Sequence, residues 1–117
     1  MTTNPGEVYM VDLGLAAKFR PMLVVSRKDP DAPRALSICA PITTSNRSSQ
    51  YEVFIGKPKF LSEQSYVNVQ GLQAIEHHEL KKRIGFISSD QMSSVKEALI
   101  FALDLGNTGE QGAAANP

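Results

Sequence analysis

An arginine and two adjacent threonines stand at the ends of two apolar segments and could together bind a phosphate group. Arg20 precedes the apolar run at 22–26, and Thr43 and Thr44 follow the apolar run at 35–42. Arginine binds phosphate oxygens through a planar fork of N–H donors, and a hydroxyl can donate to or accept from the same group. If the two segments are neighbouring strands, these side chains meet at the rim of a sheet. By themselves, the residue types still favour an exposed arginine and an ordinary strand-ending threonine.

Other kinds of catalytic site find little support in the sequence. The single cysteine, Cys39, allows no internal disulfide, and its apolar neighbours predict a buried, unreactive thiol. His77 and His78 are adjacent, so their side chains point in different directions and do not form a metal-ligand pair. The chain also lacks a glycine-rich phosphate loop and a nucleophile-elbow motif. We therefore expect neither a metal nor a cofactor.

The length of 117 residues predicts one domain. The final segment, 107–117, reads NTGEQGAAANP and has no large apolar residue. Such a segment cannot bury enough surface to offset the entropy lost on ordering, so we expect a disordered tail after an ordered domain at 1–106. The N-terminus does not resemble a signal peptide and no apolar run is long enough to span a membrane, which predicts a cytoplasmic protein.

The charge is balanced over the whole chain but not along it. Residues 1–60 carry eight lysines and arginines against five acidic residues, a net charge of +3, and residues 61–117 carry four against seven, a net charge of −3. A net charge of zero argues against a domain that binds duplex nucleic acid by charge alone. The basic N-terminal half could still form a local groove for an anion, although such asymmetry often reflects only solvated surfaces.

Strand-like segments dominate the chain, and one helix follows them. Ser88 and Gln91 have the spacing of a capping box and predict a helix over 88–104, with Gly106 as its stop signal. No helical segment separates the strands, which excludes a doubly wound sheet and favours a small curled barrel with the helix beside it. The predicted strands are at 6–13, 22–26, 35–42, 51–55, 66–75 and 81–87. The predicted core face of the helix consists of Met92, Val95, Leu99, Ala102 and Leu103.

Five segments in order resemble the MazF/PemK-type toxins, the endoribonuclease members of bacterial toxin–antitoxin pairs. These segments are GEVYMVDLG, RPMLVVS, APITT, SYVNVQGLQAI and LKKRIGFISSDQMSSVKEALIFALDLG, and together they extend over 6–106. The resemblance implies a mostly β fold with a C-terminal helix, namely a small SH3-like barrel of the MazF/PemK/CcdB type. It also implies a homodimer that cuts single-stranded RNA without a metal, and an acidic antitoxin whose disordered segment covers the basic groove.

The resemblance further assigns roles to individual residues. Arg20 and Thr43 correspond to the catalytic pair of the family, with Arg20 suited to stabilising the charge that develops when a ribose 2′-OH attacks the adjacent phosphorus. Arg20 is a poor general base because an arginine side chain keeps its proton in proteins, and the sequence identifies no other convincing base. The expected substrate contacts are Thr44, Asn68, Gln70 and Lys18.

Two departures from the family pattern and two alternative functions accompany this interpretation. The connection at 14–19 is short, and Gln70 stands where some members carry an acidic residue, so neither an RNA sequence preference nor an aspartate-assisted mechanism transfers to this chain. A CcdB-like poison of DNA gyrase shares the fold but depends on a C-terminal Trp-Gly-Ile, whereas this chain has no tryptophan and ends in AAANP. An inactive binding protein with the same fold is the other alternative, against which the presence of both Arg20 and Thr43 argues.

Overall fold

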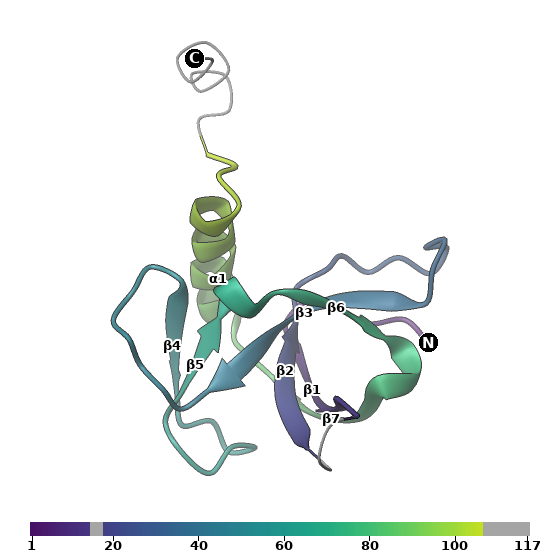
Figure 1. Cartoon of the computed structure of the whole chain (residues 1–117), viewed down its shortest axis with the longest axis horizontal. Helices are drawn as coiled ribbons and strands as arrows, with labels where there is room; N and C mark the ends of the chain where they lie inside the picture. The colour runs from purple at the N-terminus through teal and green to yellow at the C-terminus, as the bar shows by residue number, and fades with distance from the viewer. Residues whose placement is uncertain (15–17, 107–117) are drawn as a thin grey trace.

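Part of each of the strands β1 (Glu7–Asp12), β2 (Phe19–Val24) and β3 (Leu36–Thr43) is buried on both faces, and this organises the whole molecule. In the computed structural model (Figure 1), which describes residues 1–14 and 18–106, consecutive residues of these strands belong to two different cores. Val8, Leu23 and Ala40 belong to the first core, whereas their neighbours Tyr9, Met22 and Cys39 belong to the second. A strand covered on both faces reads as a continuous apolar run instead of an alternating one, as the runs at 22–26 and 35–42 do.

The described residues form one antiparallel sheet of seven strands, a pair of single-turn 3-10 helices and one α-helix. The strand order is β4-β5-β3-β2-β1-β7, with β6 paired to β3 outside this path. The strands are β1 (Glu7–Asp12), β2 (Phe19–Val24), β3 (Leu36–Thr43), β4 (Glu52–Gly56), β5 (Ser65–Asn68), β6 (Gln73–Glu76) and β7 (Leu80–Phe86). The helices are η1 (Val69–Gly71), η2 (His77–Glu79) and α1 (Ser89–Ala102).

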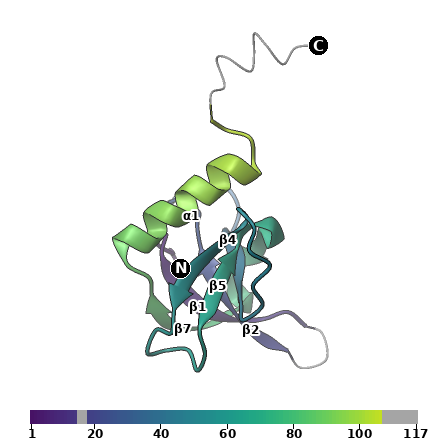
Figure 2. The same ribbon diagram turned by 90° about the vertical axis from the view of Figure 1, so that its left-hand side faces the viewer.

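The predicted fold class is confirmed, with one correction to its shape. The protein is mostly antiparallel β with a C-terminal helix, but the sheet remains open and does not close into a barrel. The helix α1 packs against β4 and η1 and covers the first core (Figure 2). None of the helices in the described part of the chain is long and apolar enough to cross a membrane. The predicted tail at 107–117 and residues 15–17 of the predicted short connection lie outside the described residues.

The predicted strand at 66–75 is two strands separated by η1. The reason is that β3 is a shared partner: Thr43 pairs with Tyr66 in β5, whereas Cys39 pairs with Gln73 in β6. The chain must step from one half of β3 to the other, and Gly71 permits this because a side chain there would meet the ring of Pro41. Sequence periodicity cannot reveal a step that depends on the length of a distant strand.

The helix begins as predicted but ends earlier than expected. Ser88 caps α1, with its hydroxyl accepting from the backbone N–H of Gln91 at 3.1 Å, and Gln91 completes the capping box. The stop is Asp104, whose φ of 57° and N–H bond to the Phe101 carbonyl end the helix two residues before Gly106. Of the predicted core face, Leu103 is wrong, because its side chain is 50% exposed beyond the last turn.

Candidate active site

The pairing of β2 with β3 brings Arg20 and Thr43 to the same end of the sheet. The paired residues are Met22 with Pro41, Leu23 with Ala40 and Val24 with Cys39. Continuing this register outward places Arg20 opposite Thr43, just beyond the last pair of the ladder. Residues opposite one another in an antiparallel pair project from the same face. The two residues singled out from their positions beside separate apolar runs are therefore brought together by strand pairing.

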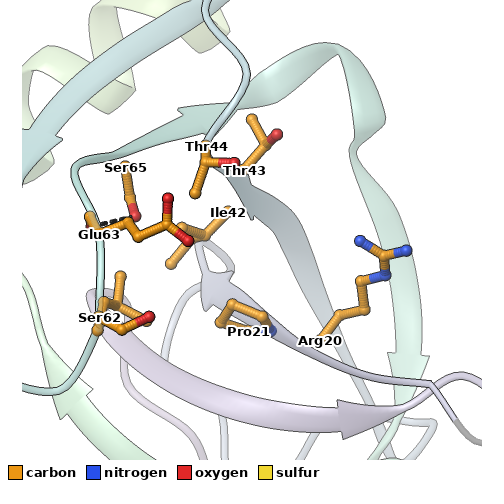
Figure 3. A pocket seen from close by; sticks show the side chains of 9 residues that line it. Arg20, Pro21, Ile42, Thr43, Thr44, Ser62, Glu63 and Ser65 are labelled. Carbon is orange, nitrogen blue, oxygen red and sulfur yellow. Dashed lines mark hydrogen bonds between the residues drawn. The ribbon is translucent and has the colours of Figure 1, made fainter.

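A cavity of about 240 Å³ opens beside these two strand ends (Figure 3). It is smaller than the roughly 300–1,000 Å³ pockets that take drug-sized ligands, so it suits a small charged group better than a whole nucleotide. In Figure 3, Arg20 and Glu63 flank the cavity from opposite sides, with Thr43 and Thr44 between them. The lining residues are Arg20, Pro21, Ile42, Thr43, Thr44, Leu61, Ser62, Glu63 and Ser65.

The hydroxyl of Thr43 is oriented by the backbone that follows it. Its Oγ1 accepts a hydrogen bond from the N–H of Ser45 at 3.0 Å, and the side chain is half-buried. Because the oxygen acts as the acceptor in this bond, its own hydrogen is available for donation to a ligand oxygen. Arg20 is exposed and stands beside Val11 of β1 in the β1–β2 ladder. A fixed hydroxyl and an exposed guanidinium thus offer donors for an anion.

Glu63 is the residue of this cavity that the sequence did not reveal. It lies on the loop between β4 and β5, a segment interpreted from the sequence only as irregular. Ser65, which is 3% exposed, holds the loop by donating its hydroxyl to the carbonyl oxygen of Glu63 at 2.9 Å. A single carboxylate in a loop has no periodic pattern that could identify it. Only the return of the chain along β5 brings Glu63 to the end of β3.

The other predicted substrate contacts do not line the cavity, apart from Thr44. Asn68 ends β5 and caps η1, where its Oδ1 accepts from the backbone N–H of Gln70 at 3.0 Å. Gln70 is exposed within η1, and Lys18 is exposed just before β2. The structure therefore brings together Arg20, Thr43 and Thr44, and leaves Lys18, Asn68 and Gln70 as predicted contacts farther along the surface.

The two histidines belong to the other end of β3. His77 Nε2 lies 2.9 Å from the hydroxyl oxygen of Ser37, near the start of that strand. Among the described residues, one cluster could in principle hold a metal: Glu76, His78 and Glu79, whose ligand atoms lie within 4.8 Å of one another. The side chains of Glu76 and Glu79 already accept hydrogen bonds from backbone N–H groups of η2 and its cap, and the cluster is largely exposed. Glu76 pairs with Leu36 at the start of β3, so the cluster lies at the opposite end of that strand from the cavity.

Two buried ionisable groups, the thiol of Cys39 and the carboxyl of Glu7, have shifted pKa values. Cys39 is buried, as expected, and burial raises the pKa of its thiol to about 12, which lowers the fraction of reactive thiolate. Burial would also raise the pKa of Glu7, but hydrogen bonds from the backbone of Asn4 and from Arg83 outweigh it and lower that pKa. The Arg83 Nη1 lies 3.0 Å from Glu7 Oε2, and Glu7 is 8% exposed. Both groups serve the fold, away from the cavity.

Comparison with known proteins places this chain among toxins. Residues 4–103 match the model of a family described as PemK-like, MazF-like toxin of type II toxin–antitoxin system. The chain is 30% identical over 114 residues to endoribonuclease MazF6 of Mycobacterium tuberculosis, an alignment that covers 90% of this chain and all of that protein. It is also similar to endoribonuclease MazF2 of Mycobacterium bovis, again at 30% identity with the same coverage.

Solved structures agree with this placement. An endoribonuclease from a mycobacterial species in complex with its cognate antitoxin superposes with a TM-score of 0.76 at 28% identity, covering 88% of this chain and 96% of that one. The toxin MazF-mt6 of Mycobacterium tuberculosis superposes with a TM-score of 0.74 at 28% identity, covering 84% and 96%. The resemblance found from five sequence segments is thereby confirmed over nearly the whole described chain.

Proposed function

Because the chain belongs to the PemK-like, MazF-like toxins of type II toxin–antitoxin systems, we propose that it is the endoribonuclease toxin of such a pair and cuts single-stranded RNA at the cavity beside Arg20 and Thr43. The observation that carries the proposal is the convergence of a guanidinium, an oriented hydroxyl and a carboxylate on one small cavity. Family membership and the curated relatives support the activity, and the cavity geometry supports the site. The alternative of a gyrase poison is not favoured by these relatives.

Residues on the two sides of the cavity have different roles in the reaction. The ribose 2′-oxygen bonds to the adjacent phosphorus as the bond from phosphorus to the 5′ oxygen breaks, which leaves a 2′,3′-cyclic phosphate and a 5′-hydroxyl. The attacking and leaving oxygens must lie roughly in line through phosphorus. Glu63, on one side, takes the proton of the 2′-OH as general base. Arg20, on the other side, stabilises the charge on the phosphoryl and departing oxygens, and the departing oxygen takes its proton from water.

Thr43 completes this arrangement by holding the phosphate in position. Its hydroxyl hydrogen can donate to a non-bridging oxygen while its oxygen stays bonded to the N–H of Ser45. A metal-assisted route is not supported, because Glu63 is the only acidic side chain among the described residues of the cavity lining, and a divalent cation in such a site draws on several oxygen ligands. Cleavage by protein groups alone is the simpler mechanism for this set of residues.

The experiment that tests the function is cleavage of a long single-stranded RNA in the presence of a chelator, with the cut ends mapped. The parent should cut, and Arg20→Ala should lower the rate about a hundred- to a thousand-fold, as loss of one electrostatic donor does. Arg20→Lys should recover little, because an ammonium does not reproduce the planar fork. Arg34→Ala, at an exposed arginine of the loop between β2 and β3, is the matched control and should cut normally. Cleavage by Arg20→Ala within a few-fold of the parent, or loss of cleavage on chelation, would contradict the assignment.

We further propose that the protein acts as a homodimer. The end of α1 carries apolar side chains that one subunit leaves in solvent: Ile100, Phe101 and Leu103 are 46%, 47% and 50% exposed. Large apolar side chains exposed together at one end of a helix are typical of an interface, and two-fold pairing is the commonest arrangement of identical subunits. Light scattering at micromolar concentration should give about twice the 12.7 kDa of one chain, and a mass near that of one chain would contradict the dimer.

The proposed antitoxin is a short acidic partner that covers the cavity and so blocks RNA. The net charge of +3 over residues 1–60 supports an acidic chain, and a disordered segment can fold across such a surface on binding. Co-expression of the product of the neighbouring gene should allow co-purification and suppress cleavage. A neighbouring product that neither co-purifies nor suppresses cleavage would count against it.

A further inference from the structure

We propose that Phe54 and Tyr66 form a stacking site for the nucleobase next to the bond that is cut. This inference rests on the proposed function, because it assigns a part of the RNA substrate to a surface beside the cavity. It goes beyond that function by naming two residues outside the cavity lining and the chemical group that they bind.

Strand register places both rings in line with Thr43. Thr43 pairs with Tyr66 across β3 and β5, and Tyr66 pairs with Phe54 across β5 and β4. Directly opposite residues of antiparallel strands project from the same face of the sheet. Neighbouring strands lie about 4.8 Å apart, so Tyr66 stands roughly 5 Å and Phe54 roughly 10 Å along the sheet from Thr43. The row leads directly away from the proposed position of the reacting phosphate.

The alternate residues of the same strands show that this row faces outward. Ile42, Val67 and Val53 alternate with Thr43, Tyr66 and Phe54, and all three pack in or against the first core. Phe54 is 53% exposed and Tyr66 is half-buried. Their ring centroids lie 5.3 Å apart at an interplanar angle of 48°. The two rings therefore present apolar faces and edges to solvent beside a cavity that holds donors for an anion.

An unpaired nucleobase is the part of a single-stranded RNA that suits such an aromatic surface. Single-stranded RNA is bound by stacking its unpaired bases on aromatic rings while basic groups hold its backbone. Here Arg20, on β2, supplies the contact to the backbone at one end of the row, and the rings of Tyr66 and Phe54 stand two and three strands away on β5 and β4. The alternative is a purely structural role, in which the cross-strand aromatic pair only stabilises the sheet. That role would not require the rings to be in register with the residue that holds the phosphate.

The test separates binding of the base from chemistry. The probe is a single-stranded DNA oligonucleotide, which has no 2′-OH and cannot be cut by the proposed route, with an abasic nucleotide placed at each position in turn. For the parent, the abasic nucleotide at one position should weaken binding about tenfold, within the range that loss of one stacked base produces. Phe54→Leu and Tyr66→Leu should bind the intact oligonucleotide about tenfold more weakly, and the abasic nucleotide should then cost them nothing further. Tyr66→Phe should bind like the parent.

Cleavage kinetics on RNA give the second readout. Phe54→Leu should raise KM about tenfold with kcat within about twofold, because stacking of the base holds substrate and transition state alike. Phe86→Leu is the matched control: it changes a ring that is 74% exposed on β7, at the opposite end of the strand order from β4, and it should alter neither binding nor kinetics. Circular dichroism of each variant confirms that it is folded.

The stacking site and the proposed function can each be contradicted while the other stands. If Phe54→Leu and Tyr66→Leu bind the oligonucleotide within twofold of the parent while the parent cuts RNA, the stacking site is wrong and the function stands. If they lose affinity for an acidic antitoxin peptide but not for the oligonucleotide, the surface binds a protein and the inference is likewise wrong. If the oligonucleotide results are as expected but the parent does not cut RNA, the stacking site stands and the proposed function fails.

Discussion

Because Phe60 lies close to Gly85, we expect Gly85→Ala to destabilise the parent protein but to stabilise a Phe60→Ala variant. Gly85 lies in β7 and pairs with Val8 of β1. A Cβ atom added at Gly85 would lie 2.6 Å from Cε2 and 2.7 Å from Cγ of Phe60, and closer still to Cδ2, whereas ordinary contacts begin at 3.4 Å. The ring would have to retreat by roughly 1 Å. Because its backbone is held in the β1–β7 ladder, Gly85 cannot make that space, and the ring must give way.

The size of the expected destabilisation follows from the displacement of the Phe60 ring. Overpacking of this kind costs about 1–3 kcal/mol of the free energy of unfolding, so Gly85→Ala should destabilise by that amount. In a Phe60→Ala background the obstruction is gone, and Gly85 has no positive φ that would make alanine unfavourable. Replacing glycine by alanine should then stabilise by about 0.4–1 kcal/mol through the lower entropy of the unfolded chain. The two effects of the same substitution should differ by about 1.4–4 kcal/mol and have opposite signs.

Urea denaturation of the four proteins of the cycle measures this difference, provided that all share one protein concentration, since the stability of a dimer depends on it. The cavity supplies an independent readout, because Phe60 lies on the loop that carries Leu61, Ser62 and Glu63. Gly85→Ala should therefore also slow RNA cleavage, although Gly85 does not line the cavity. An equal cost of Gly85→Ala in both backgrounds would show that the contact with Phe60 is not the cause, and would refute the reasoning.

Three further predictions concern ionisable groups. Glu63→Gln should lower kcat about 10²- to 10⁴-fold with little change in KM, and a kcat within a few-fold of the parent would rule out Glu63 as the base. The pKa of Glu7 is lowered below its ordinary value of 4.5, so its contribution to stability should be complete above pH 4.5 and be lost as the pH falls through the folded pKa. Urea denaturation should therefore show that the difference in free energy of unfolding between the parent and Glu7→Gln shrinks from about pH 7 to about pH 3. A constant difference would contradict this. Cys39, with a pKa of about 12, should not react with a thiol-specific disulfide reagent at pH 8 until urea unfolds the protein, and rapid labelling of the native state would show that the thiol is accessible.

The sequence alone was sufficient for features that depend on neighbouring residues. The cap of α1 at Ser88 and Gln91 was predicted because a capping box is a contact between residues three apart. The buried state of Cys39 followed from its apolar neighbours, and the strands that correspond to β2 and β3 followed from the apolar runs at 22–26 and 35–42. Five segments in order also indicated the family, since a family is defined by residues in sequence and not by their contacts.

Tertiary structure decided everything that depends on which strands are neighbours. The sequence offered Arg20 and Thr43 as separate strand ends, and only the register of β2 on β3 places them opposite one another. Glu63 was missed because a loop carboxylate acquires a role only when β5 returns the chain to the end of β3. Likewise, the segment at 66–75 divides in two because β3 is long enough to pair with β5 at one end and β6 at the other. Local propensity acts over a few residues, whereas the site is assembled by hydrogen bonds between strands far apart in the chain, and those are set by the global fit of the two cores.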